Sequence, residues 1–263
     1  MPETGTTTTP HVTAHVEPSQ GVVFRALLRW QLAQIGGTVL PLVVVVQALL
    51  AAGIIIGFGL LIPDITPDTA LFLSTGAPTV LLVTVGLVIV PQGVARARAD
   101  GTFAYLRTLP IARPLLLVAD LSVWLVLALP SVAVAVLVAW LRYDLAFSFD
   151  WPLLIAAAVL VTITSTAVGY AIAVSLPPML AQLISQVLVF FVLLFSPVTY
   201  PASQLPSWFQ VVHDVLPVRP AADLLRAGLA GDVYGMRWVD LAVVVAWCLV
   251  GLAISLRALM KRG

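Results

Sequence analysis

Long apolar runs alternate with short polar segments along this chain. A helix needs about 20 apolar residues to cross a hydrocarbon core of about 30 Å. Six runs meet this length, at residues 37–62, 73–93, 115–141, 152–176, 179–196 and 239–256. From Trp151 to His213 the chain contains no Asp, Glu, Lys or Arg. The pattern therefore predicts an all-α integral membrane protein with six transmembrane helices.

Two regions outside these runs differ in character. Residues 1–20 are polar, carry two acids and a Thr run, and lack the apolar core of a signal peptide, so we expect a disordered cytoplasmic tail. We expect residues 21–263 to form the transmembrane domain. At its start, Phe24 lies on an apolar helical face, while Arg25 and Arg29 share another face. This spacing predicts a helix lying in the membrane interface, with a plain extension of the first span as the alternative.

Proline positions and charge refine the topology. Pro130 lies inside the third run and predicts a kink there, while Pro177-Pro178 separates the fourth and fifth runs. The basic residues divide unevenly between the two sides of the membrane. With the N-terminus inside, the inner segments hold Arg25, Arg29, Arg96, Arg98, Arg107, Arg113, Arg257, Lys261 and Arg262, whereas the outer segments hold Arg142, Arg219, Arg226 and Arg237. The positive-inside rule thus predicts both termini in the cytoplasm. Four tryptophans fall near the outer ends of spans: Trp140, Trp151, Trp208 and Trp238.

Composition agrees with a membrane protein and excludes several other classes. The chain is 61% hydrophobic and 10% charged, with a mean hydropathy of +1.09. A formal net charge of +1 argues against nucleic acid as a partner. The single cysteine, Cys248, allows no disulfide within the chain and no cysteine metal site, and we expect no metal.

The inner segment between the second and third spans, residues 94–114, differs from an ordinary loop. Asp100, Gly101 and Thr102 precede a short predicted helix from Phe103 to Thr108, which Leu109-Pro110 ends. Exposed apolar residues and nearby arginines on a short capped helix favour docking into another protein. The alternative is an amphipathic connector lying on lipid headgroups.

The outer segment after the fifth span is rich in proline, including Pro201 and Pro206, and cannot form one long helix. It predicts two short helices, at 203–215 and 220–229, with Trp208 and Phe209 dipping into the outer leaflet and Arg226 in the second helix. We interpret it as a hairpin that partly re-enters the membrane from outside. An ordinary extracellular loop with a surface helix is the alternative.

These two segments resemble the ABC-2 family of ABC-exporter permeases. In that family the loop after span two reads acid-x-x-x-Gly-Thr-x-Glu-x-Leu-x-x-x-Pro, and span five is followed by Ser-Pro/Gly-x-x-x-Pro-x-x-x-x-Pro-x-Trp. The family's Glu is replaced here by Ala104, so apolar docking takes more weight than ion pairs. The matching stretches are Ala99-Asp100-Gly101-Thr102-Phe103-Ala104-Tyr105-Leu106, Thr108-Leu109-Pro110, Ser196-Pro197-Val198-Thr199-Tyr200-Pro201 and Leu205-Pro206-Ser207-Trp208.

The resemblance implies the ABC-2, or type V exporter, fold: six spans with an N-terminal interfacial helix, a cytoplasmic coupling helix and an extracellular re-entrant hairpin before the last span. It also implies a bacterial inner-membrane permease that resembles drug and natural-product exporters. The permease works with a second permease copy or paralogue and with membrane lipid around it. The coupling residues implied are Asp100, Gly101, Thr102, Phe103, Tyr105, Leu106 and Arg107.

A separate ATPase subunit is expected to supply the energy. The sequence has no Gly-x-x-x-x-Gly-Lys-Ser/Thr loop, and its only lysine is Lys261. We therefore expect no enzyme activity and no cofactor bound by this chain. ATP and Mg²⁺ are expected on the partner subunit.

The spans offer few polar groups for a cargo path. We expect the path to involve Gln47, Thr84, Gln182, Ser185 and Gln186. Helix–helix hydrogen bonding is the alternative role for any single hydroxyl. Uncharged polar groups among apolar ones favour export of a hydrophobic or amphipathic cargo such as a drug, natural product or lipid.

Three other functions stay open at this stage. The same fold moves lipid-linked polysaccharides or glycolipids in other family members. An ion-coupled secondary transporter is disfavoured, because such coupling usually needs acids within the membrane. A membrane enzyme would have to rely on His213 and Asp214 near the outer face, and no catalytic motif accompanies them.

Overall fold

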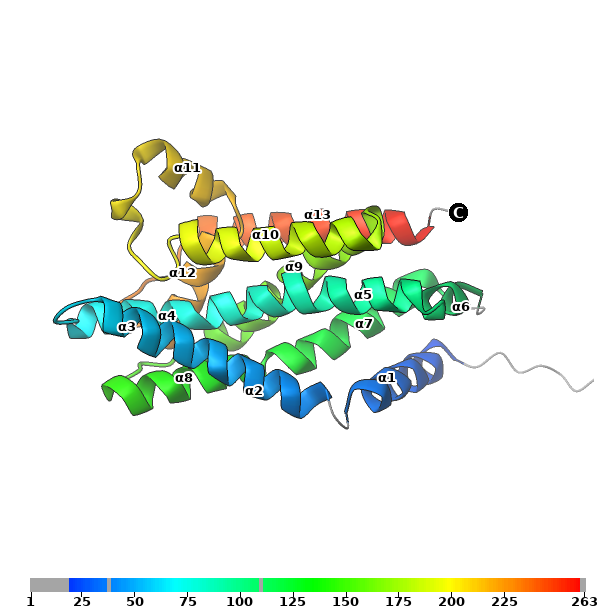
Figure 1. Cartoon of the computed structure of the whole chain (residues 1–263), viewed down its shortest axis with the longest axis horizontal. Coiled ribbons are helices and arrows are strands. Elements are labelled where there is room, and N and C mark those ends of the chain that lie inside the picture. Colours follow the sequence, from blue (N-terminus) through cyan, green and yellow to red (C-terminus); the bar gives the residue numbers. More distant parts are fainter. Residues whose placement is uncertain (1–18, 37–38, 109–110, 261–263) are drawn as a thin grey trace, which may run out of the picture.

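The computed structural model describes residues 19–36, 39–108 and 111–260 (Figure 1). Within these ranges the chain is helical, with one isolated bridge between Ser148 and Ala230 and no strand. Six helical segments are long and apolar enough to cross a membrane: Pro41–Leu61, Pro67–Ala99, Arg113–Tyr143, Trp151–Ser175, Pro178–Phe195 and Trp238–Met260. The prediction of an all-α fold with six spans is therefore confirmed. Most of the tail predicted at 1–20 lies outside the described residues, as do Leu109, Pro110 and Lys261.

The helices follow one another with short connections. In chain order they are α1 (Gln20–Gly36), α2 (Val39–Ala52), the π-helix η1 (Gly53–Gly57), α3 (Phe58–Leu61), α4 (Pro67–Thr84), the π-helix η2 (Val85–Ile89), α5 (Val90–Ala99), α6 (Thr102–Thr108), α7 (Arg113–Ala128), α8 (Pro130–Tyr143), α9 (Trp151–Ser175), α10 (Pro178–Phe195), the 3₁₀ turn η3 (Ala202–Gln204), α11 (Ser207–Val215), α12 (Val218–Leu229) and α13 (Trp238–Met260).

Span two is longer at both ends than the 73–93 predicted from its apolar run. It begins at Pro67, because the Thr66 hydroxyl accepts a hydrogen bond from the Thr69 backbone N–H and Pro67 fits the first turn. It continues through the polar residues before Asp100, which follows the last helical residue. Gly101 then adopts φ +76°, a left-handed conformation that glycine adopts without strain. The inner segment, predicted to start at residue 94, thus begins as helix.

The predicted break in span three lies where proline places it. α7 ends at Ala128 and α8 begins at Pro130, whose ring cannot continue the hydrogen-bond ladder. The two halves then pack against different neighbours: α7 against α9 and α1, and α8 against α4 and α2.

The outer hairpin also differs in detail from its prediction. The piece expected at 203–215 is divided into η3 and α11, because Pro206 separates them. The second helix begins at Val218 after Pro217, so Pro220 lies in its third position rather than at its start.

α9 occupies the centre of the bundle and packs against α13, α12, η2 and α5. Close approach requires glycine where η2 meets α9. A Cβ on Gly169 would lie only 1.9 Å from the Gly86 carbonyl oxygen. Small residues thus let two spans touch through their backbones, as is typical of helix packing in membranes.

The two ends of the bundle carry different elements (Figure 1). α6, α1 and the C-terminal end of α13 gather at one end. α11, α12, α3 and the junction between α8 and α9 gather at the other. The segments with candidate chemistry are therefore separated by the full length of the spans.

Candidate functional site

The predicted coupling segment is a short helix at the end of a continuous helical span. α6 packs against α5, to which Asp100 and Gly101 join it. Asp100, Gly101 and Tyr105 are exposed, with the Tyr105 ring 62% exposed, while Thr102 and Leu106 are half-buried. The side chains of Phe103 and Arg107 lie outside the described residues. An exposed helix at this position is available for contact with another protein.

Two arginines near α6 bind helix ends instead of forming part of an open docking surface. Arg98 donates from Nη1 to the carbonyl oxygens of Ala173, at 2.6 Å, and Leu176, at 2.7 Å, where α9 ends. Arg113 donates in the same way to Leu259 in α13. The last carbonyls of a helix lack partners within the helix and carry partial negative charge, so a cation there is stabilising. Both arginines thereby connect the α6 region to the spans behind it.

The predicted interfacial helix α1 contacts the bundle along one face. Phe24 and the buried Leu27 pack against Leu116 and Ala119 of α7, whereas Arg25 and Arg29 are exposed. Gln31 is buried and donates from its side-chain amide to the Asp120 carboxylate. The sequence prediction missed Gln31. This residue follows Leu27 by four positions, so its polar side chain interrupts the apolar face of the helix.

The five predicted path residues do not share one surface. Gln47 and Ser185 are buried inside the single chain, at 2% and 1% exposure. Thr84 is half-buried and donates to the Val80 carbonyl within its own helix. Gln182 and Gln186 are exposed and lie one turn apart on α10. Of the five, these two glutamines reach the surface of the chain, in the first half of the apolar span α10.

The two helices of the outer hairpin differ in burial. In α11, Trp208 is 67% exposed and Phe209 is half-buried; Pro201 and Pro206, which precede α11, are exposed. α12 packs against α4, α9 and α13, and nearly all of its side chains from Pro220 onward are buried. The hairpin is therefore inserted through α12 into the end of the bundle that lies away from α6.

Arg226 fixes α12 in this position. Its side chain is 2% exposed and pairs with Asp223 at 2.8 Å. It also donates to the Val198 carbonyl, and its guanidinium carbon lies 3.8 Å from the centroid of the Phe72 ring in α4. Burial lowers the pKa of Arg226, and Asp223 opposes that shift by favouring the charged form. One side chain thus joins α12, the segment after α10, and α4.

The supposed pair of His213 and Asp214 does not form a dyad. His213 is 1% exposed and packs against the rings of Phe191 and Phe209, with centroids 6.3 Å and 4.6 Å away. Asp214 is exposed and pairs with Arg219 instead. Within the described residues no group of three or more His, Cys, Asp or Glu side chains is placed to hold a metal ion. His213 thus makes an aromatic contact, and His213 and Asp214 form no acid–base pair.

The sequence matches the model of a known protein family. The family model described as ABC-2 type transporter matches residues 22–230, which is more than half of the chain. The chain belongs to the ABC-2 type transporter family. Such permeases are the membrane components of ABC transporters, are not catalytic themselves, and work with an ABC ATPase subunit. No curated protein matches this ABC-2 permease.

Proposed function

We propose that this ABC-2 permease exports a hydrophobic or amphipathic small molecule, driven by ATP and Mg²⁺ on a separate ATPase subunit. Two copies, or one copy and a paralogue, enclose the path in a bacterial inner membrane. The termini lie in the cytoplasm, and ATP-driven closure of the ATPase pair moves the spans through α6. Cargo leaves on the side where α11 and α12 lie.

The unequal charge of the two ends supports this orientation. Described arginines near α6 are Arg25, Arg29, Arg96, Arg98, Arg113 and Arg257. The end with α11 and α12 instead carries Asp64, Asp68, Asp144, Asp150, Asp214, Asp223, Asp232 and Asp240 beside four arginines. Excess positive charge marks the cytoplasmic side. The exposed Tyr105 ring then faces the cytoplasm, where the ATPase subunit binds.

The exposed glutamine face of α10 is the observation that carries the cargo assignment. A side-chain amide that faces hydrocarbon without a partner is unfavourable by several kcal/mol, at about 2–7 depending on the reference state. Gln182 and Gln186 are exposed along a span that has no charged residue. A path between two permeases would give these amides polar contacts. Amides among apolar side chains suit an uncharged or amphipathic molecule better than an ion.

Transport by the reconstituted complex tests the proposal. The permease is purified with the ATPase subunit that co-purifies with it and is placed in phosphatidylcholine vesicles, and ATP-dependent movement of a panel of hydrophobic fluorescent dyes is measured. Changing Gln182→Leu together with Gln186→Leu should lower dye transport by about tenfold, the factor that corresponds to about 1.4 kcal/mol. Binding of the ATPase subunit should be unchanged, because α6 is not altered.

Gln92→Leu is the matched control. Gln92 is also an exposed glutamine but lies on α5 instead of α10. This variant should transport at the wild-type rate. Full transport by the α10 double variant would remove both glutamines from the path. A complex that hydrolyses ATP yet moves none of the dyes would contradict the assignment of a hydrophobic cargo.

A further inference from the structure

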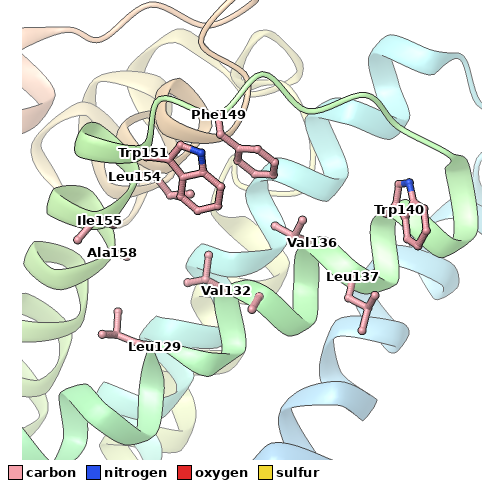
Figure 2. Close-up of a pocket in the computed structure, with 11 residues that line it drawn as sticks. Leu129, Val132, Val136, Leu137, Trp140, Phe149, Trp151, Leu154, Ile155 and Ala158 are labelled. Carbon is pink, nitrogen blue, oxygen red and sulfur yellow. The ribbon is translucent and has the colours of Figure 1, made fainter.

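An apolar groove runs between α8 and α9 on the outer half of the bundle (Figure 2). It arises from the break at Pro130. Before the break α7 packs against α9, but after it α8 turns to pack against α2 and α4. The two helices therefore separate toward the outer end, and the space between them has a volume of about 530 Å³. We call this space the α8–α9 groove; α8 with Leu129 forms one wall, and Phe149, Trp151 and α9 form the other.

The floor and the walls of the groove differ in exposure. The floor residues Val132, Leu154 and Ala158 are buried, at 8%, 6% and 4% exposure. On the walls, Leu137 and Ile155 are 51% and 59% exposed. Every lining side chain is aliphatic or aromatic. The groove is thus concave and open along its side, and it offers no polar group along its length except the two indole N–H donors at its end.

Aromatic rings close the outer end. Phe147 stacks on Phe149 with centroids 5.6 Å apart, and Phe149 stacks on Trp151 at 4.9 Å. Trp140 lies on the opposite wall (Figure 2). The Trp140 and Trp151 side chains are 53% and 59% exposed. Tryptophan prefers the headgroup level, where its ring is in apolar surroundings and its N–H reaches polar partners.

The groove matches one leaflet in length. From Leu129 to Trp140 the chain advances about 16 Å at about 1.5 Å per residue. Half of a hydrocarbon core of about 30 Å is nearly the same length. With the tryptophans at headgroup level, Leu129 lies near the middle of the bilayer. A second permease copy fits this groove less well. The proposed contact between two copies uses the polar face of α10, and α10 lies at the opposite edge of the bundle from α8 (Figure 1).

We propose that the α8–α9 groove binds one acyl chain of an outer-leaflet phospholipid. The chain lies along Val132, Leu154 and Ala158, and the indole N–H groups of Trp140 and Trp151 donate to the ester or headgroup oxygens of that lipid. The bound acyl chain packs on the floor residues of the groove and thereby stabilises the outer hairpin. Leu154 and Ala158 belong to the same buried cluster as Leu224, Leu225 and Leu229 of α12.

Photo-crosslinking of reconstituted protein tests the site. The full chain is placed in phosphatidylcholine vesicles that contain a small fraction of phosphatidylcholine with a diazirine at the end of one acyl chain, then irradiated and mapped by mass spectrometry. Adducts should concentrate on residues of the groove, and those from the chain end should lie near Leu129. Leu249 of α13 and Leu49 of α2 are 62% and 68% exposed and serve as reference surfaces that contact lipid without a groove.

Ala133→Trp fills the groove from its exposed wall without changing the buried floor. The indole ring should displace at least about two methylenes of the acyl chain from the groove. Because each buried methylene contributes about 0.8 kcal/mol, labelling of the groove should fall by about tenfold or more. Ala156→Trp is the matched control, because Ala156 is also exposed but does not line the groove. It should leave labelling unchanged. Equal labelling of the groove and the reference surfaces, no effect of Ala133→Trp, or crosslinks between two protein copies at the groove would overturn the proposal.

Discussion

Span two and span five are alike in hydropathy and opposite in burial. Their mean hydropathies are 2.1 and 2.2. Yet 83% of the residues in an apolar 18-residue stretch of span two are buried within the chain, against 17% in the corresponding stretch of span five. In a membrane both lipid and protein interior are apolar, so hydropathy identifies a span without saying what covers it. Burial has to be inferred from another property of the residues.

Residue size provides that property. Span two buries a run of small and hydroxyl-bearing residues from Ser74 to Thr79, which lets neighbouring backbones approach. Span five exposes large side chains, such as Phe190 and Leu194, with Gln182 and Gln186 among them. Span two is therefore built for contact inside one chain, and span five for contact with lipid, cargo or a second chain.

Arg226→Met gives the largest expected effect on this comparison. The change removes the charge that pairs with Asp223 and leaves the Val198 carbonyl without its donor beside span two. Leaving the buried Val198 carbonyl oxygen without its donor costs about 1–3 kcal/mol, and losing the desolvated cation–π contact with Phe72 costs about 2 kcal/mol more. We expect a much lower yield of folded protein and a lower Tm in detergent, measured by fluorescence-detected size exclusion after heating.

Arg219→Met is the control for that change. Arg219 pairs with Asp214, whose side chain is 50% exposed, and at the longer distance of 3.8 Å with Asp223, which is 28% exposed. A pair open to water contributes about 0–1 kcal/mol, so this variant should remain close to the wild type. Equal losses in both variants would show that charge number, rather than the Arg226 contacts with span two, governs stability.

Gly76→Val is expected to have the next largest effect. A Cβ at Gly76 in span two would lie 2.0 Å from the Val198 carbonyl oxygen and 3.0 Å from Arg226 Nη2. Overpacking of this kind costs about 1–3 kcal/mol, and the backbone oxygen has little room to move. Gly53→Val is the matched control, since a Cβ at Gly53 meets nothing within 4 Å. The thermal shift should be large for Gly76→Val and small for Gly53→Val; similar shifts would mean that the close approach to span two is not required.

The sequence predicts local features of this fold much better than its long-range contacts. The six spans, the break at Pro130 and the short helix after Gly101 depend on neighbouring residues, so periodicity and proline chemistry suffice to find them. The hydrogen bond from Gln31 to Asp120 joins residues 89 positions apart, and that from Arg98 to Ala173 joins residues 75 apart. A single sequence carries no signal for such pairs. Charge patterning instead assigned Arg98 to a docking surface, because it does not distinguish a solvated arginine from one that binds a helix end.

The sequence also does not show which distant residues the candidate site residues contact. Five path residues were chosen for being polar and within spans, but polarity alone does not separate Gln47, which is buried against α4, from Gln186, which is exposed. Arg226 was chosen as part of an outer hairpin. Its contact with Phe72 became visible only when α12 was placed against span two.

The aromatic contact between α11 and span five supplies a third and smaller test. His213 of α11 is buried against Phe209 and against Phe191 of α10. Burial lowers the pKa of His213 below its usual value of 6.5, and Arg219 lowers it further, while Asp214 and the Phe195 carbonyl act in the opposite direction. The docked form of α11 therefore binds a proton less readily than the undocked form.

Lowering the pH should accordingly weaken the docking of α11 on span five. The stabilisation is complete above pH 6.5 and is lost as the pH falls from that value toward the lower pKa of the docked form, with opening increasing by up to about tenfold per pH unit in that window. Hydrogen exchange of the α11 amides between pH 7.5 and 5, corrected for the intrinsic pH dependence of exchange, measures the effect. His213→Phe keeps a ring against Phe191 and Phe209 but cannot titrate, so its corrected profile should be flat. A sloped profile in that variant would assign the pH dependence to a group other than His213, and the contact of His213 with span five would then not respond to protons.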